Sequence, residues 1–265
     1  MSHFFFVVEG VHDVEAVGCL VKRRGFRRIQ QHRLLPEYWD KLVPKKFPFD
    51  GDLLRRVPVP TFFKSENDSL GIINAIGLEK IVGAVKASLL GLPEPPDGLG
   101  ILLDADLEVL PEVRWKEIQA DLTDFDFGKS PGGIGSGTIR AGIYVLPDNQ
   151  GTGTLEDLLL ECAAQAYPEL SRMAHQFVGP IVGTDSSIFP DPADSEDFRK
   201  PSGKKKATAG CISSILKPGK AIQVSIQDNG WLKHEKALEL PRVVAVQRFV
   251  DQILGIENVS NSKAK

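Results

Sequence analysis

The amino-acid sequence predicts an α/β fold in which a mainly parallel sheet carries helices on both faces. Continuous apolar segments alternate along the chain with segments of helical periodicity, which is the pattern of repeated βαβ units. The apolar segments do not alternate in polarity, as is usual for strands buried on both faces. Carboxylates directly follow two of these segments, where the functional groups of parallel sheets gather. Helical patterns near the end of the chain predict a helical C-terminal extension.

Each expected strand is a short apolar run bounded by turn residues. The run "HFFFVV" ends in Glu9-Gly10, and the run "GILL" ends in Asp104. The expected strands are residues 3–8, a short strand near 26–34, 70–77 with its turn, 99–106 and 139–146.

The expected helices are recognised by an apolar stripe and by their end signals. Pro111 suits the first turn of a helix, Thr154 suits an N-cap, and Gly25 suits a stop. Residues 35–67 are rich in Pro, Lys and Phe and predict an irregular excursion, and the glycine-rich residues 128–137 predict a flexible loop. The expected helices are residues 13–24, 78–90, 111–122, 154–167, 207–216 and 241–254.

Length and composition are ordinary for a globular protein of one large or two modest domains: 265 residues, 42% hydrophobic and 25% charged. We expect an α/β domain over 1–177 and a helical extension with a charged loop over 178–265. A net charge of −3 excludes a generic polyanion binder, so nucleic-acid binding would need a local basic patch. Three scattered cysteines indicate neither a disulfide framework nor a zinc knuckle. We expect a cytoplasmic protein without a signal peptide or membrane span.

An acidic constellation is the main functional signal. Asp104-Ala105-Asp106 places two carboxylates at one strand end, and Glu9 adds a third from another strand. Carboxylates at close range repel one another unless a cation lies among them, and hard oxygen ligands favour Mg²⁺ or Mn²⁺. In isolation each acid has another explanation: the Asp pair suits a solvated turn, and Glu9 suits a helix cap. Their shared position at strand ends favours the metal hypothesis.

The segments "FFFVVEGVHDVEAV" and "GILLDAD" resemble the TOPRIM domain of topoisomerases, primases and related nucleases. In that family a Glu followed by Gly closes the first strand, and an Asp-x-Asp closes a later one. The resemblance covers residues 1–110, extends through the strand at 139–146, and implies a TOPRIM-like, Rossmann-like sheet. It implies that Glu9 is the general acid or base and that Asp104 and Asp106 hold Mg²⁺, with Glu9 near the ion. The whole chain is similar to small stand-alone TOPRIM-like proteins related to OLD-type nucleases.

Three further acids are candidates for a second metal. Asp13 resembles the second acid of the first OLD-type motif, although a charge at a helix N-terminus explains it equally well. Glu156 and Asp157 begin the helix at 154–167, on the rim that carries Glu9. The alternative for Glu156 is a solvated acid in the first turn, and the alternative for Asp157 is a capping box with Thr154.

A basic segment, "FRKPSGKKKATAG", supplies the candidate nucleic-acid contacts Lys200, Lys204 and Lys205. The resemblance to OLD-type nucleases makes Lys206 the candidate catalytic lysine. A solvated lysine run is the commoner outcome for such a sequence. The segment "PGGIGSG" lacks the GK[ST] ending of a P-loop, so the chain shows no ATPase motif of that kind.

These features favour a Mg²⁺-dependent (or Mn²⁺-dependent) nuclease acting on phosphodiester bonds of DNA or RNA. Three tyrosines and a short chain argue against a topoisomerase. The alternative is a non-catalytic or regulatory TOPRIM module that works with a partner ATPase, supplied in trans, in a defence or toxin system. A nucleotide-dependent phosphotransferase is a third hypothesis. The sequence leaves open whether the chain forms a homodimer.

Overall fold

The computed structural model describes residues 1–45 and 59–256. Part of the segment expected to be irregular, residues 46–58, lies outside the described residues. The end of the expected C-terminal extension, residues 257–265, also lies outside them. The helices and strands, with η for 3₁₀ helices, are β1 (Ser2–Val8), α1 (Val11–Lys22), β2 (Arg27–Arg28), η1 (His32–Leu34), η2 (Glu37–Leu42), β3 (Thr61–Lys64), β4 (Asp68–Asn74), η3 (Leu78–Lys80), α2 (Ile81–Gly91), β5 (Gly98–Asp104), α3 (Pro111–Asp121), β6 (Arg140–Leu146), α4 (Leu155–Ala166), α5 (Pro168–Val178), η4 (Pro192–Ser195), α6 (Glu196–Arg199), α7 (Gly203–Leu216), α8 (Ile222–Asp228), α9 (Glu235–Leu238) and α10 (Pro241–Ile253).

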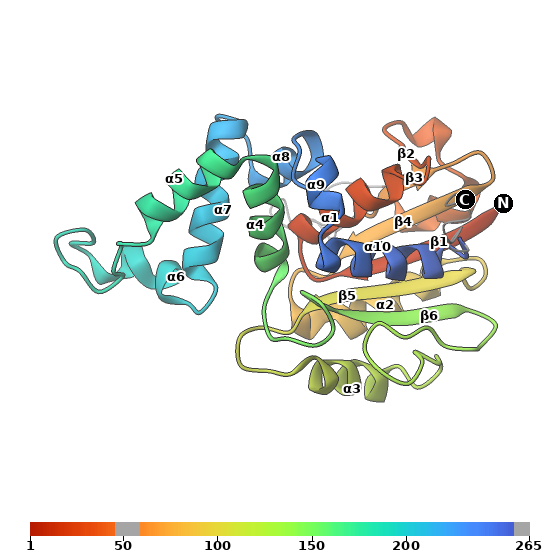
Figure 1. Cartoon of the computed structure of the whole chain (residues 1–265). Helices are drawn as coiled ribbons and strands as arrows, with labels where there is room; N and C mark the ends of the chain where they lie inside the picture. Colours follow the sequence, from red (N-terminus) through yellow and green to blue (C-terminus); the bar gives the residue numbers. More distant parts are fainter. Residues whose placement is uncertain (46–58, 257–265) are drawn as a thin grey trace, which may run out of the picture.

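A six-stranded sheet of order β2-β3-β4-β1-β5-β6 organises the molecule (Figure 1). Strands β4, β1, β5 and β6 are parallel, whereas β3 pairs antiparallel with β4 and β2 antiparallel with β3. Among the parallel strands, β1 is first in the chain and lies between the second and the third. The strand order therefore reverses between β1 and β5, and such a switch point is the usual ligand site of an open α/β sheet.

The two faces of the sheet form two hydrophobic cores. Phe4, Phe6 and Val8 of β1 pack in one core with α1, α4 and α10. Phe5 and Val7 point to the other core, which contains η2, α2 and α3. Figure 1 shows α1 and α10 on one face and α2 and α3 on the other. Burial on both faces explains why the strands are continuously apolar.

Glycine makes room for aromatic rings above β5 and β6. Gly100 is paired with Phe6, and a Cβ atom added at Gly100 would lie 2.3 Å from the Phe6 ring. A Cβ atom at Gly142 would lie 2.7 Å from the Phe249 ring of α10. The missing side chains let these rings lie flat on the sheet.

The glycine-rich loop at 128–137 covers the β6 edge instead of extending into solvent. Gly132 and Gly135 donate backbone hydrogen bonds to Ile143 and Ala141 of β6. Asp126 closes the loop by accepting hydrogen bonds from the backbone N–H groups of Gly128 and Ser136 at 2.9 Å each. The expectation of a loop is confirmed, and its backbone satisfies β6 groups that would otherwise be unpaired.

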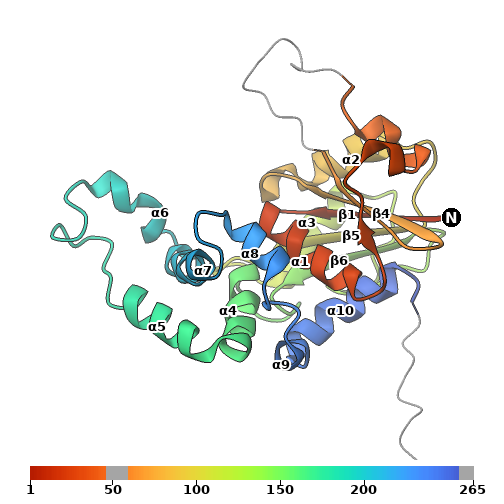
Figure 2. The same cartoon turned by 90° about the horizontal axis from the view of Figure 1, so that it is seen from above.

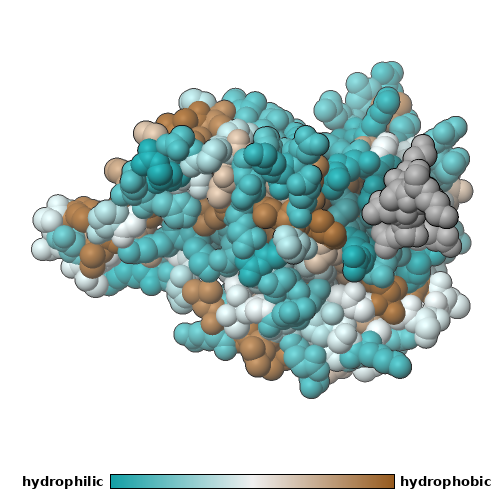
Figure 3. All heavy atoms as spheres, in the orientation of Figure 1, coloured by the Kyte–Doolittle hydropathy of each residue, from teal (hydrophilic) through white to brown (hydrophobic). Residues whose placement is uncertain are grey.

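Beyond the carboxyl ends of the parallel strands, α5, α6 and α7 form an arm that projects from the sheet (Figures 1 and 2). The arm is attached through α4, which packs against both α5 and α7. Its exposed apolar residues include Met173 and Phe177 of α5, and the space-filling view shows hydrophobic patches on the arm separated by hydrophilic surface (Figure 3).

The last helices return to the sheet. α8 packs on α1, and α10 lies against β5 and β6. Arg24, two residues after α1, forms an ion pair with Asp251 of α10, which is almost fully buried. Residues on both sides of the expected boundary at 177 therefore share one core. No helix in the described ranges has the length and apolar character that crossing a membrane requires.

The α/β, Rossmann-like fold class is confirmed, but several local expectations are wrong. The short strand near 26–34 is reduced to Arg27–Arg28, and the antiparallel strand Thr61–Lys64 lies inside the segment expected to be irregular. The helix Pro168–Val178 was not expected at all. The first helix begins at Val11 and not at Asp13, because Gly10 is its N-cap.

We expect Gly100→Ala to destabilise the fold by about 1–3 kcal/mol, because the new methyl group would overpack the Phe6 ring. The control is Gly83→Ala in α2, where an added Cβ meets nothing within 4 Å. That exposed helical change should raise stability by about 0.5–1 kcal/mol. Urea unfolding of both variants checks the pair, and equal stabilities would contradict the packing account.

Candidate functional site

Glu9 lies at the switch point between β1 and β5. It follows the last residue of β1, and its Oε2 accepts a hydrogen bond of 3.2 Å from the backbone N–H of Asp104 at the end of β5. Burial and the charge of Asp106 raise the pKa of Glu9, although the Asp104 N–H and the Lys206 charge act in the opposite direction. The Glu9 carboxyl thus lies directly against the strand that carries the Asp-x-Asp motif.

Asp104 occupies the last position of β5 and points toward the start of α4. Its Oδ1 accepts a hydrogen bond of 2.8 Å from the Leu155 N–H. Burial, followed by the charges of Asp13, Glu9 and Glu156, raises the pKa of Asp104 well above its ordinary value. The predicted metal ligand is therefore a partly buried carboxyl surrounded by other acids.

Asp13 lies beside them in the first turn of α1, where its side chain caps the helix. Its Oδ2 accepts a hydrogen bond of 2.9 Å from the Gly10 N–H. Only 7% of Asp13 is exposed, and its Oδ1 has no hydrogen-bond partner. Burial and the charges of Glu9 and Glu156 raise the pKa of Asp13 to about 7. Asp13 therefore lies at a helix N-terminus as expected, but the hydrogen bond to Gly10 accounts for only one of its two oxygens.

Glu156 completes the carboxylate cluster, by which we mean Glu9, Asp13, Asp104 and Glu156. It is almost fully buried at the start of α4, and His12 Nδ1 lies 3.8 Å from its Oε1. Burial raises the pKa of Glu156, but the His12 imidazole and the Lys206 ammonium outweigh burial, and the pKa is lowered. Glu156 is thus not a solvated first-turn acid, and it is the charged member beside three acids whose pKa values are raised.

Asp157 is held by two structural contacts. Its Oδ2 accepts a hydrogen bond of 2.9 Å from the Thr154 N–H, which is the Asp157 half of the expected capping box, whereas the Thr154 hydroxyl has no hydrogen-bond partner. Its Oδ1 forms an ion pair of 2.7 Å with Lys205 of α7. Both oxygens therefore have partners, and the ion pair joins the start of α4 to the arm.

Asp106 differs from Asp104 in conformation and in exposure. Its backbone has a φ of 64°, which turns the chain away from the strand direction. Its exposed carboxylate forms an ion pair of 2.9 Å with Arg114 of α3. Asp106 acts electrostatically on Glu9, but it does not share the partly buried position of Asp104. The two carboxylates of the Asp-x-Asp motif therefore lie at one strand end, but only Asp104 lies among the other acids.

The predicted basic residues lie on α7 and just before it. Lys206 is exposed and close enough to Glu9 and Glu156 to lower the pKa of both. Lys200 forms an ion pair with Asp197, and Lys204 donates a hydrogen bond of 3.1 Å to the Gly179 carbonyl. Exposed pairs of this kind contribute little energy, so these lysines retain the capacity to contact a polyanion.

In the part of the chain that the structure describes, no three His, Cys, Asp or Glu side chains are already arranged as a metal site. Mg²⁺ does not need such a set, because it usually takes one or two carboxylates and keeps water in its other positions. The donors fit this ion. They are hard oxygens, and one of them, Asp13 Oδ1, is buried without a partner.

Sequence reasoning missed two residues of the site, His12 and Arg114. His12 was not singled out, because the five histidines of the chain share no metal spacing, yet it precedes Asp13 and its Nδ1 lies 3.8 Å from Glu156. Arg114 was not singled out, although it lies in the helix directly after the Asp-x-Asp strand and pairs with Asp106. In both cases the sequence held one signal, which was that the residue lies close along the chain to an acid already proposed for the site.

Comparison with known proteins places the chain in a family. The family model described as "Protein of unknown function (DUF3226)" matches residues 4–250. The chain belongs to the DUF3226 family. The DUF3226 chain matches no curated protein sequence. It is similar to the crystal structure of hypothetical protein PH0156 from Pyrococcus horikoshii OT3, with 18% identity, a TM-score of 0.46, and coverage of 94% of this chain and 99% of that one.

The raised pKa of Asp13 and Asp104 predicts how the stability of the DUF3226 protein depends on pH. The pKa of Asp13 rises from about 4 in the unfolded chain to about 7 in the folded protein, and the pKa of Asp104 is also raised. The folded state therefore binds more protons than the unfolded chain as pH rises above about 4, so these groups lower stability. Asp104→Asn keeps an acceptor for Leu155 but removes the charge. Without added metal, it should stabilise the protein by roughly 1–3 kcal/mol at pH 8 and have little effect at pH 4.

Thermal and urea unfolding across pH 4–8 would measure the difference between variant and wild type. Asp106→Asn is the control, because Asp106 is exposed and paired with Arg114. A stability difference for Asp104→Asn that does not grow with pH would contradict the repulsion account.

Proposed function

We propose that this protein is a TOPRIM-type nuclease, dependent on Mg²⁺ or Mn²⁺, that hydrolyses phosphodiester bonds of DNA or RNA. The observation that carries the proposal is the contact of Glu9 with the end of β5 at the switch point, within the carboxylate cluster. Acids from two separate strands and two helix starts meet there. A site built only to cap helices would not require all of them to be buried together.

Asp104 and Asp13 are the residues that would hold the ion, with Glu156 and Asp106 beside them. Asp104 is the partly buried carboxyl at the strand end, and Asp13 has a free oxygen. A bound Mg²⁺ would neutralise phosphate charge and orient a water molecule. Asp157 is a weaker candidate than the sequence indicated, because its oxygens already bind Thr154 and Lys205.

The chain supplies a proton-transfer group and a cation in addition to the metal ligands. The pKa of Glu9 is raised, so its carboxyl group can accept a proton from an attacking water or donate one to the leaving oxygen nearer to neutral pH than a free Glu. The Lys206 ammonium is placed to pair with a nonbridging phosphate oxygen. We infer a cytoplasmic setting from three free cysteines, two of them buried.

Metal binding is the first test. Isothermal titration of the metal-free protein with Mn²⁺ should show binding that Asp104→Asn weakens by at least 10-fold, because a partly buried ligand charge is removed. Asp106→Asn should weaken it less, because that carboxylate is exposed and paired with Arg114. An unchanged affinity in Asp104→Asn would end the assignment of Asp104 as a ligand.

Cleavage is the second test. With Mg²⁺ or Mn²⁺ and mixed single-stranded and double-stranded substrates, Glu9→Gln should lower the cleavage rate by about 10²–10⁴-fold while Mn²⁺ binding persists. Lys220→Gln, which removes a charge from the turn after α7, serves as the control. Metal binding by the wild type without any cleavage would favour the regulatory TOPRIM module over the nuclease.

A further inference from the structure

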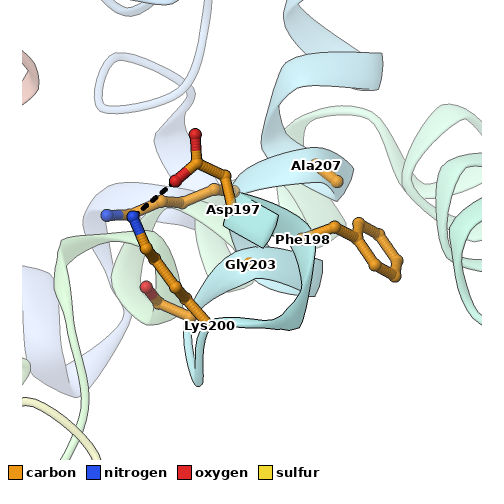
Figure 4. A pocket seen from close by; sticks show the side chains of 7 residues that line it. Asp197, Phe198, Lys200, Gly203 and Ala207 are labelled. Carbon is orange, nitrogen blue, oxygen red and sulfur yellow. Dashed lines mark hydrogen bonds and ion pairs between the residues drawn. The ribbon is translucent and has the colours of Figure 1, made fainter. Parts of the chain in front are cut away.

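A hollow of about 460 Å³ lies between α6 and the start of α7, on the arm beside the carboxylate cluster. The volume falls within the roughly 300–1,000 Å³ of small-ligand sites. Its lining residues are Asp197, Phe198, Lys200, Ser202, Gly203, Lys206 and Ala207. In Figure 4, Asp197 and Lys200 lie on one side, the Phe198 ring lies on the other, and Gly203 and Ala207 lie between them.

The hollow depends on a close approach of the backbone at Gly203. A Cβ atom there would lie 2.3 Å from the Phe198 carbonyl oxygen and 2.5 Å from that of Asp197. Glycine therefore allows α7 to start directly against α6. This approach brings the Phe198 ring, Lys200 and Lys206 to one concavity, although Lys200 lies in the turn after α6 and Lys206 lies in α7.

The chemistry of the lining suits a nucleoside next to a phosphate. Phe198 offers an aromatic face, and the Lys200 and Lys206 ammonium groups outnumber the one carboxylate, Asp197. Lys206 also lies near enough to Glu9 and Glu156 to affect both carboxyls. A strand whose phosphate reaches Lys206 at the cluster would have its neighbouring base beside the hollow.

We propose that this hollow receives an unstacked base, so that the protein binds single-stranded nucleic acid in preference to a duplex. This inference rests on the proposed function and names its substrate class. Stacking on an aromatic side chain is tolerant of sequence because every base has a π-face, whereas bases in a duplex are stacked on one another and cannot enter. Lysines on the rim would contribute phosphate contacts without reading sequence.

The test is binding, measured by fluorescence anisotropy with the full-length protein in EDTA so that no cleavage occurs. The probes are oligothymidylate, oligouridylate and a duplex of oligothymidylate with oligoadenylate. A single-stranded probe should bind at least 10-fold more tightly than the duplex. Phe198→Ala should weaken that binding by about 5- to 100-fold, the usual cost of losing one stacking platform.

The matched control is Phe177→Ala on α5, because Phe177 is 68% exposed and lies outside the hollow. It should leave the affinity within about 2-fold. Since Phe198 also packs near Phe189, at 5.9 Å between ring centroids, Phe198→Ala could loosen the arm. Ala207→Leu fills the hollow without removing that contact, and it should weaken single-strand binding as well.

Duplex binding as tight as single-strand binding, or equal affinities in Phe198→Ala and Phe177→Ala, would overturn the inference. So would a folded Ala207→Leu protein with wild-type affinity. These results would not remove metal-dependent cleavage, which Asp104→Asn and Glu9→Gln test separately. A preference for oligothymidylate over oligouridylate, or the reverse, supports the inference in either case and shows whether the protein prefers DNA or RNA.

Discussion

The repulsion among buried carboxyl groups at the β1–β5 crevice is the constraint on which the site depends. Glu9, Asp13 and Asp104 are each largely removed from water. The charges of Glu9 and Glu156 raise the pKa of Asp13, and the charges of Asp13, Glu9 and Glu156 raise that of Asp104. Burial of acids without a compensating charge is unfavourable, and proteins usually avoid it. A fold that keeps them together must therefore hold them with other interactions, which are the hydrogen bonds from backbone N–H groups.

Those N–H groups come from the ends of the elements that surround the crevice. The Asp104 N–H binds Glu9, the Gly10 N–H binds Asp13, and the Leu155 N–H binds Asp104. At the starts of both α1 and α4 an Asp at the third helical position accepts a hydrogen bond from the N-cap backbone N–H, and the positive ends of two helices face the acids. Rigid strand ends and helix starts fix these groups more precisely than loops would, as a preorganised site requires.

The parts that the sequence predicted well are those governed by local patterns. Apolar runs located β1 and β5, and the acids at their ends were correctly placed at one edge of the sheet. The pairing of Thr154 with Asp157 was also visible, because the two residues are only three positions apart in the sequence. What failed depended on distant contacts. β3 is a strand because it pairs with β4, and its sequence lies in a segment with few regular signals.

The same distinction explains what the sequence left open at the site. Whether Asp157 faces a metal or a lysine depends on where α7 lies, 48 residues later in the chain. Asp106 looks equivalent to Asp104 in sequence, but its positive φ and the position of Arg114 bring it into solvent. The unpaired oxygen of Asp13 is likewise invisible until the neighbours that bury it are known.

The link between the arm and the cluster follows from two consecutive lysines. Neighbouring residues of an α-helix point about 100° apart, so Lys205 and Lys206 of α7 cannot face the same partner. Lys205 pairs with Asp157 at the start of α4, and Lys206 acts on Glu9 and Glu156. The rotation of α7 that allows this ion pair also turns Lys206 toward the acids. Gly203 is the first residue of α7 and lines the hollow. One orientation of α7 therefore positions both the Lys206 ammonium near the carboxylates and the Phe198 ring next to it.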